Sequence, residues 1–237
     1  MRTDQLLGAL TDLVLPAACA GCRAAGAPLR SGVCAGCAAL LDGLRPGPVR
    51  PSPAPAGLPP CTALGGYAGA LREVLLAYKE RGRHGLGRPL GFLLAEVVAA
   101  AVRSPRPTVL VPVPTTMRAA RARHGDHLTR IVRPAVRRLR AAGWPVTVAR
   151  PVRALPRPDS AELDAAGRAE AAAAGFRLRP MSVSRLPRVV AGHAVVVVDD
   201  IVTTGSSIAA IAKLLNDCDV TVDAAAVLAA TVRRGRA

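Results

Sequence analysis

The chain has few aromatic residues, few acidic residues and very few lysines. Among 237 residues there are one Trp, two Tyr and two Phe. Grooves for single-stranded nucleic acid usually stack bases on aromatic side chains, so this composition argues against such a groove. The 16 Asp and Glu residues face 32 Lys and Arg, and only Lys79 and Lys213 are lysines. The net charge of +16 is thus nearly all arginine.

That charge has two explanations. It favours polyanionic partners, with nucleic acid, pyrophosphate and anionic lipid as the classes to consider. A composition rich in Arg, Ala, Pro and Gly that follows from a GC-rich genome explains it equally well.

Long apolar runs are also missing. The longest, around Phe92 to Val102, contains Glu96 and falls short of the roughly 20 apolar residues of a membrane span. Near the N-terminus, Asp4 and Asp12 interrupt the apolar stretch that a secretion signal needs. We expect a short amphipathic helix there instead, with Leu6, Leu10, Leu13 and Val14 on one face. A cytoplasmic protein without a membrane span is therefore expected.

Four of the six cysteines form two Cys-x-x-Cys pairs, Cys19 with Cys22 and Cys34 with Cys37. Two such knuckles bring four thiolates to a tetrahedral Zn²⁺ and leave no open position, which predicts a structural zinc site. Two disulfides are the alternative, which a reducing cytoplasm disfavours. Cys218 is expected in the core, and the isolated Cys61 is either a loop thiol or the remnant of a larger metal module.

A Pro-rich stretch separates this module from the rest. Residues 45–60 carry Pro at nearly every second position, which excludes a helix or a central strand and predicts an extended linker. A polyproline ligand for a partner is the alternative. The predicted domains are residues 1–44, with the N-terminal helix and a zinc ribbon, the linker 45–60, and a larger domain over 61–237.

Strand and helix patterns alternate through the larger domain. Helices are predicted over 71–78, 86–102, 159–174 and 206–215, and strands over 108–113, 144–148, 195–198 and near Val220 and Val227. Residues 150–158 are predicted to be a loop. Such alternation predicts an α/β fold with a parallel sheet covered on both faces.

The most informative stretch runs from Val195 to Ser207. Four valines predict a buried strand, Asp199 and Asp200 follow where it is expected to end, and Thr203 to Ser207 opens a helix. Free N–H groups at a helix start, hydroxyls beside them and a permissive Gly205 suit a phosphate dianion. The carboxylates would repel that phosphate, so they fit sugar hydroxyls or Mg²⁺. Together they predict a ribose 5-phosphate site; an ordinary strand with an acidic N-cap is the alternative.

A second strand ends in a similar way, in Val113, Pro114, Thr115 and Thr116. The carboxyl edge of a parallel sheet is where open α/β folds bind ligands. Arg118, Arg121 and Arg123 follow, and either a phosphate group or a solvated helix face explains them. We interpret His124 and His127 as polar surface residues.

The order of these motifs resembles one family. The repeated Cys-x-x-Cys, Tyr67-x-Gly69-x-Leu71-Arg72, Val111-Pro112-Val113-Pro114 and Val198-Asp199-Asp200-Ile201-Val202-Thr203-Thr204-Gly205 are similar to ComF, or competence protein F, proteins. Members are type I phosphoribosyltransferase-like, with a Rossmann-like parallel sheet and an N-terminal zinc ribbon. The resemblance implies DNA uptake in natural transformation, with single-stranded DNA and a helicase-like protein as partners.

The resemblance also implies roles for residues. The ligand would be phosphoribosyl pyrophosphate (PRPP) with Mg²⁺, and its ribose hydroxyls would bind the acidic pair. The ribose-phosphate segment would comprise Asp199, Asp200, Ile201, Val202, Thr203, Thr204, Gly205, Ser206 and Ser207. Pyrophosphate would bind near Val113, Pro114, Thr115, Thr116, Arg121 and Arg123. The family's Arg-Gly-Phe-Asn-Gln is here Arg123-His124-Gly125-Asp126-His127, and its Gln-x-x-Leu-Ser is also altered, at residues 160–164. Ribose-phosphate binding is therefore predicted more firmly than turnover, and no catalytic acid or base is assigned.

Overall fold

The computed structural model describes residues 18–115, 125–155, 175–180 and 185–231. The chain divides into two compact units. The first comprises Met1–Leu44 and Ala68–Leu86, and the second comprises Arg45–Tyr67 and Gly87–Ala237. The first unit thus combines the predicted zinc module with a helix from farther along the chain. The second includes the Pro-rich segment that we expected to be a linker.

A small hairpin opens the described part of the first unit. Strands β1 (Leu29–Arg30) and β2 (Val33–Cys34) pair antiparallel. Ser31 and Gly32 join them with φ values of 54° and 86°, the backbone that a tight two-residue hairpin needs. Helix α2 (Ala35–Asp42), helix α3 (Gly69–Lys79) and the 3₁₀ turn η1 (His84–Leu86) follow. The residues that predicted α3 are all buried: Leu71, Val74, Leu75 and Tyr78.

A six-stranded sheet forms the centre of the second unit, in the order β3-β4-β10-β9-β5-β6. Its strands are β3 (Gly47–Val49), β4 (Cys61–Gly66), β5 (Thr108–Pro112), β6 (Val146–Val148), β9 (Ala194–Val202) and β10 (Ala224–Ala230). Every neighbouring pair is parallel except β3 with β4. This mostly parallel sheet confirms the predicted α/β fold.

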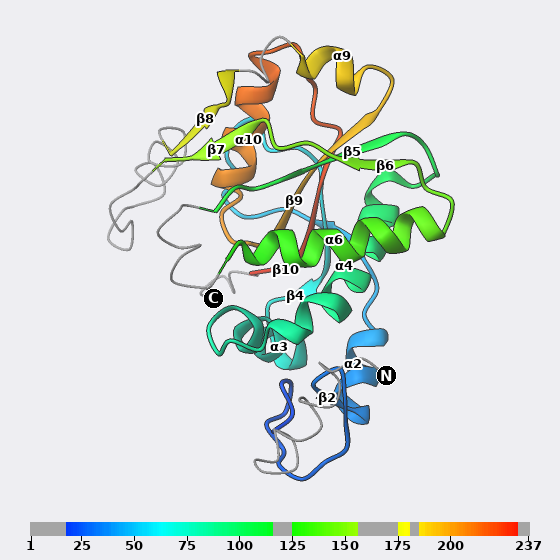
Figure 1. Cartoon of the computed structure of the whole chain (residues 1–237). Coiled ribbons are helices and arrows are strands. Elements are labelled where there is room, and N and C mark those ends of the chain that lie inside the picture. The colour runs from blue at the N-terminus through cyan, green and yellow to red at the C-terminus, as the bar shows by residue number, and fades with distance from the viewer. Residues whose placement is uncertain (1–17, 116–124, 156–174, 181–184, 232–237) are drawn as a thin grey trace. The chain divides into compact units, whose positions relative to one another are not determined.

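Helices cover both faces of that sheet (Figure 1). Helix α4 (Gly87–Val102) packs on β10, β4 and α6 (His127–Ala141). Gly91 allows the two helices to approach closely, because a Cβ there would lie 2.5 Å from the Ile131 carbonyl oxygen. On the other face, α9 (Leu186–Val190) and α10 (Ser206–Asn216) share a buried cluster with Val195 and Val197 of β9.

Some expected elements differ in the structure. Part of the Pro-rich segment forms β3, where Pro48 is tolerated because an edge strand does not need every N–H. The loop expected over 150–158 contains β7 (Val152–Ala154), which pairs antiparallel with β8 (Phe176–Leu178). The strand expected near Val220 is not formed, because the backbone of residues 220–223 is irregular. The strand expected near Val227 is β10. The helices expected over 6–14 and 159–174 fall outside the described residues.

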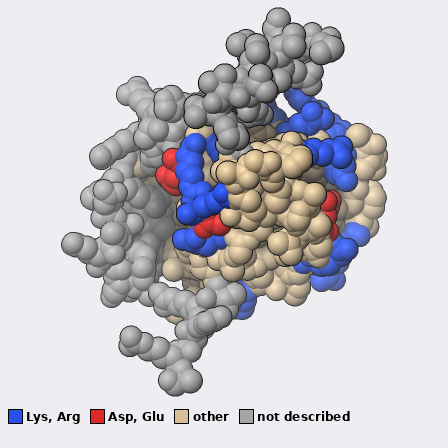
Figure 2. All heavy atoms as spheres, turned by 90° about the horizontal axis from the view of Figure 1, so that it is seen from below, with Lys and Arg blue, Asp and Glu red and all other residues tan. Residues whose placement is uncertain are grey.

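One helical stretch, His84–Val102, is long and apolar enough to cross a membrane by composition alone, with a mean hydropathy of 1.5. In the structure 56% of that window is buried, as expected for a core helix. Length and hydropathy are therefore weak evidence for a membrane span here. On the face drawn in Figure 2, basic side chains cover more of the surface than acidic ones, in several separate groups around uncharged residues.

Candidate functional site

The ribose-phosphate segment begins inside strand β9. The strand continues through Asp199 and Asp200 to Val202, so the expectation that it ends at Val198 is wrong. The physical reason is the parallel neighbour β10, whose Ala230 is still in register with Val202. The acidic pair consequently has a fixed strand geometry before the chain turns into the loop.

The loop that follows has the backbone of an anion site. Gly205 sits at the N-cap of α10 with φ 78° and ψ 0°, a left-handed conformation that costs glycine little. The Ser206 backbone N–H donates to Thr204 Oγ1 at 3.4 Å, and the Thr204 and Ser206 hydroxyls lie 3.0 Å apart. The turn therefore gathers hydroxyl groups around the first N–H groups of a helix, where anions bind well.

A second constraint at Gly205 comes from the Pro-rich segment. A Cβ on Gly205 would lie 2.9 Å from Leu58 Cδ1 and 3.5 Å from Pro51 Cγ. The segment expected to be a linker therefore packs against the phosphate loop. Sequence reasoning missed this contact, because nothing in the Pro-rich pattern specifies which surface the extended chain would cover.

The loop encloses a small polar hollow of about 40 Å³. A hollow of this small size, lined mainly by polar atoms, suits one phosphate group. Its lining consists of Asp199, Ile201, Val202, Thr203, Thr204, Gly205, Ser206, Ser207 and Ile208. The structure thus brings together the predicted ribose-phosphate residues, with Asp200 as the exception.

Asp200 has a different environment from its neighbour. Its side chain is only 5% exposed, and its Oδ2 lies 2.6 Å from Nε2 of His127 at the start of α6. The Asp200 backbone N–H donates to Asp199 Oδ1 at 2.9 Å. The interpretation of His127 as a surface residue is wrong, since its side chain is 12% exposed.

A sequence signal for the position of His127 existed. Asp126 caps α6 by accepting a hydrogen bond from the Thr129 backbone N–H at 3.2 Å and one from the Thr129 hydroxyl. Asp is a preferred N-cap residue, so Asp-x-x-Thr could have identified a helix start here. The first turn of that helix lies near the end of β9, where His127 reaches Asp200.

The predicted pyrophosphate segment is partly described. Pro112 of β5 is in register with Val198 of β9, so Val113, Pro114 and Thr115 follow at the edge where Asp199 lies. The Val113 N–H already donates to the Val198 carbonyl oxygen at 2.9 Å, so Val113 has no backbone donor to offer a ligand. Thr116, Arg121 and Arg123 lie outside the described residues, and so do Arg118 and His124.

In the first unit, Cys19, Cys22, Cys34 and Cys37 have their sulfur atoms within 4.8 Å of one another. Tetrahedral zinc with Zn–S bonds of about 2.3 Å requires S···S edges of about 3.8 Å, and the Cys22 and Cys34 sulfurs are 3.7 Å apart. Gly21 makes room, because a Cβ there would lie 2.7 Å from Cys37 Sγ. The four cysteines therefore fit a metal such as zinc.

The charges in this cluster support the same assignment. Burial alone would raise the pKa of Cys19, but backbone N–H groups aimed at its sulfur, including Cys34 N at 3.2 Å, lower it to about 6. Burial and the neighbouring thiols raise the pKa of Cys37 to about 12. Sulfurs packed so closely cannot all ionise without a cation between them. A divalent metal would remove that conflict.

Arginines gather around one acid in this unit. Glu73 Oε2 accepts from Arg23 Nη2 at 2.6 Å and from Arg81 Nη2 at 3.1 Å, and Oε1 accepts from Arg72 Nη1 at 2.6 Å. The hydrogen bonds from Arg23 and Arg81 hold the pKa of Glu73 below its usual value.

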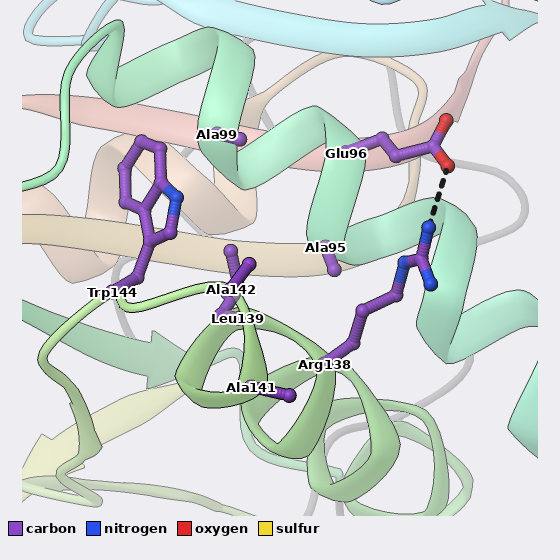
Figure 3. A pocket seen from close by; sticks show the side chains of 8 residues that line it. All are labelled: Ala95, Glu96, Ala99, Arg138, Leu139, Ala141, Ala142 and Trp144. Carbon is purple, nitrogen blue, oxygen red and sulfur yellow. Dashed lines mark ion pairs between the residues drawn. The ribbon is translucent and has the colours of Figure 1, made fainter.

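A separate pocket of about 370 Å³ lies between α4 and α6 (Figure 3). Its floor is mainly alanine, Trp144 forms one wall, and Arg138 lies 3.9 Å from Glu96 at the opposite side. No residue of the ribose-phosphate segment lines it, so it is distinct from the hollow at the end of β9.

Of the comparisons with known proteins, the one with protein-family models agrees with this geometry. No curated protein matches the chain. Residues 91–236 match the family model described as the phosphoribosyl transferase domain, and they make up more than half of the chain. They include β9, the phosphate loop and α10. The chain therefore belongs to the phosphoribosyltransferase domain family.

Proposed function

We propose that the chain binds PRPP, or another 5-phosphoribosyl ligand, at the carboxyl end of β9. The observation that carries this proposal is the hollow in which Asp199 and the hydroxyl-lined Gly205 turn face the same space. The turn would hold the 5′-phosphate, and the acidic pair would hold the ribose. Pyrophosphate would lie toward Val113 to Thr116, with Arg121 and Arg123 assisting.

Mg²⁺ would accompany the ligand. It is a hard cation that prefers carboxylate and phosphate oxygens, and it would neutralise charge on the pyrophosphate beside Asp199 and Asp200. If the protein catalyses a reaction on PRPP, it is a phosphoribosyltransferase that breaks the bond between the anomeric carbon and pyrophosphate. Its residues would then act by positioning the sugar and stabilising the leaving group.

Calorimetry with PRPP and Mg²⁺ tests the binding. The wild type should bind, and the double variant Asp199→Asn/Asp200→Asn should lose at least about tenfold in affinity, as expected when hydrogen bonds to charged groups are removed. Asp217→Asn/Asp219→Asn removes the same charge from exposed acids after α10 and should bind normally. Absence of binding, or equal binding by the first double variant, would contradict the proposal.

We also propose that this function serves DNA uptake, as in the ComF proteins that the motif order resembles, and that the protein works in the cytoplasm. A four-cysteine cluster that fits a metal such as zinc, in the same chain as a phosphoribosyltransferase domain, supports this assignment, and reduced thiolates suit a reducing compartment. The alternative is a binding-only module of the uptake machinery that contacts single-stranded DNA or a helicase, and the charge of +16 supports it.

Deletion experiments must respect the two units. Removing residues 1–60 would also remove β3 and the Leu58 contact at Gly205, so Cys22→Ser/Cys34→Ser is the better way to disable the first unit alone. Gel-shift assays with single-stranded DNA at about 50 and 200 mM salt test the alternative: phosphate contacts predict a steep loss of binding. A shift that salt does not weaken would contradict backbone binding.

A further inference from the structure

The two adjacent carboxylates at the end of β9 face opposite sides of the sheet. Successive side chains of a strand alternate between faces. Val195 and Val197 belong to the buried cluster with α10, so Asp199 is on the α10 side. Asp200 is on the side of α4 and α6, where it meets His127.

Asp199 is the carboxylate at the ligand side. It lines the hollow together with the turn at Gly205, and Asp200 is absent from that lining. The hydrogen bond from the Asp200 backbone N–H to Asp199 Oδ1 fixes its side chain. A sugar whose 5-phosphate occupied the turn would therefore meet Asp199 first.

The Asp200 side chain is fixed by a contact on the face of the sheet opposite to α10. Its carboxylate is 5% exposed, and the 2.6 Å contact with His127 ties the end of β9 to the first turn of α6. Asp126 fixes that turn by capping it. The pair thus links the strand that carries Asp199 to a helix 73 residues away in sequence.

We propose that the acidic pair is divided in function: Asp199 contacts the ribose, and His127 is a positioning residue that acts through Asp200. This inference rests on the proposed binding of a 5-phosphoribosyl ligand. It differs from the family resemblance, which assigns both carboxylates to the ribose hydroxyls. His127 contributes by fixing the backbone that presents Asp199 to the sugar.

The test measures affinities of the full-length protein for ribose 5-phosphate and for inorganic phosphate, which probe the turn with and without the sugar. Asp199→Ala should weaken ribose 5-phosphate binding by at least about tenfold. It should not weaken phosphate binding, because the lost carboxylate repels an anion in the same hollow. His127→Ala should weaken ribose 5-phosphate binding about three- to tenfold, again without affecting phosphate. His127→Gln, which keeps an N–H donor for Asp200, should restore most of the loss.

A double-mutant cycle separates positioning from direct contact. Residues that act through one hydrogen bond are non-additive, so His127→Ala/Asp200→Ala should bind like Asp200→Ala alone. The effects of His127→Ala and Asp200→Ala should each be smaller than that of Asp199→Ala. The matched control is His193→Gln, at the amino end of β9, where the ring contacts the Ala191 carbonyl oxygen; it should bind like the wild type.

Two outcomes would overturn the inference while leaving the proposed function intact. One is that the wild type binds ribose 5-phosphate and the loss of affinity in His127→Ala/Asp200→Ala equals the product of the two single losses. The other is a His127→Ala variant that loses affinity for phosphate and ribose 5-phosphate equally, as a merely structural defect would. A wild type that binds neither PRPP nor ribose 5-phosphate would overturn the proposed function, and the role of Asp199 with it.

Discussion

The two sites of this protein are built in contrasting ways. The four-cysteine site takes its ligands from a short stretch, Cys19 to Cys37, and a local hairpin brings them together. The site at the end of β9 collects residues from three distant parts of the chain: the turn at Gly205, Leu58 of the Pro-rich segment, and His127. A local site is specified by spacing, whereas the second needs the whole sheet to form first.

Loss of the metal should produce the largest effect and break only the local site. Structural zinc in small modules contributes about 10–16 kcal/mol of folding free energy, so we expect Cys22→Ser/Cys34→Ser to unfold the first unit. Metal analysis should find one zinc per chain in the wild type and none in the variant. Amide exchange should accelerate through α2 and α3, while ribose 5-phosphate affinity is retained.

Cys218→Ser is the control for that experiment, because Cys218 lies outside the cluster. It should keep its zinc and its exchange protection. Wild-type protein without zinc, or normal protection of α2 in the double variant, would show that the cysteines do not depend on a metal.

Gly205→Ala should have the next largest effect, confined to the non-local site. The left-handed backbone costs an alanine about 1–2 kcal/mol, and its Cβ would also press on Leu58 at 2.9 Å. We expect at least about a tenfold loss of phosphate affinity together with a lower melting temperature. Calorimetry and thermal unfolding monitored by circular dichroism measure the two effects.

Two further variants separate the causes. Gly192→Ala has a similar φ of 73° and nothing within 4 Å of its Cβ, so it should show the backbone cost without loss of phosphate binding. Adding Leu58→Ala to Gly205→Ala should recover part of the affinity. Equal behaviour of Gly205→Ala and Gly192→Ala would mean that the packing of the Pro-rich segment does not matter.

The same contrast explains what the sequence could predict. Spacing alone was enough to predict the cysteine cluster, and the alternation of strand and helix patterns was enough for the α/β fold. The strand-turn-helix pattern at Val195 to Ser207 predicted the residues that line the hollow, apart from Asp200. The partner of Asp200 was missed, since a histidine in a polar stretch looks like a surface residue until β5, β9 and α6 are assembled. Leu58 and β3 were missed for a related reason: proline excludes helices but does not say where an extended segment packs.

The smallest effect is expected at Cys61, a buried cysteine of the second unit that can be compared with Cys19 in the four-cysteine cluster. It begins β4 and is buried in the core of the second unit, and its Sγ lies 3.2 Å from the Pro59 carbonyl oxygen. Burial raises its pKa from 9.0 to about 11, against a smaller opposing effect of Arg50. Core packing thus keeps this thiol protonated, whereas backbone donors lower the pKa of Cys19.

The pH dependence of stability tests that difference. Because the folded pKa is raised, the unfolded chain loses this proton first as pH increases. Stability is therefore intact below about pH 9 and falls by at most about 1.4 kcal/mol per pH unit up to about pH 11. Urea unfolding of the second unit measures the free energy of unfolding as a function of pH. Between about pH 9 and pH 11 it should fall more steeply in the wild type than in Cys61→Ala, in which the thiol is absent and the other titrating groups remain.

Identical slopes for the two proteins would mean that Cys61 ionises as easily in the folded core as in the unfolded chain. The packing around the start of β4, where Cys61 pairs with Val49 of β3, would then be looser than the structure shows.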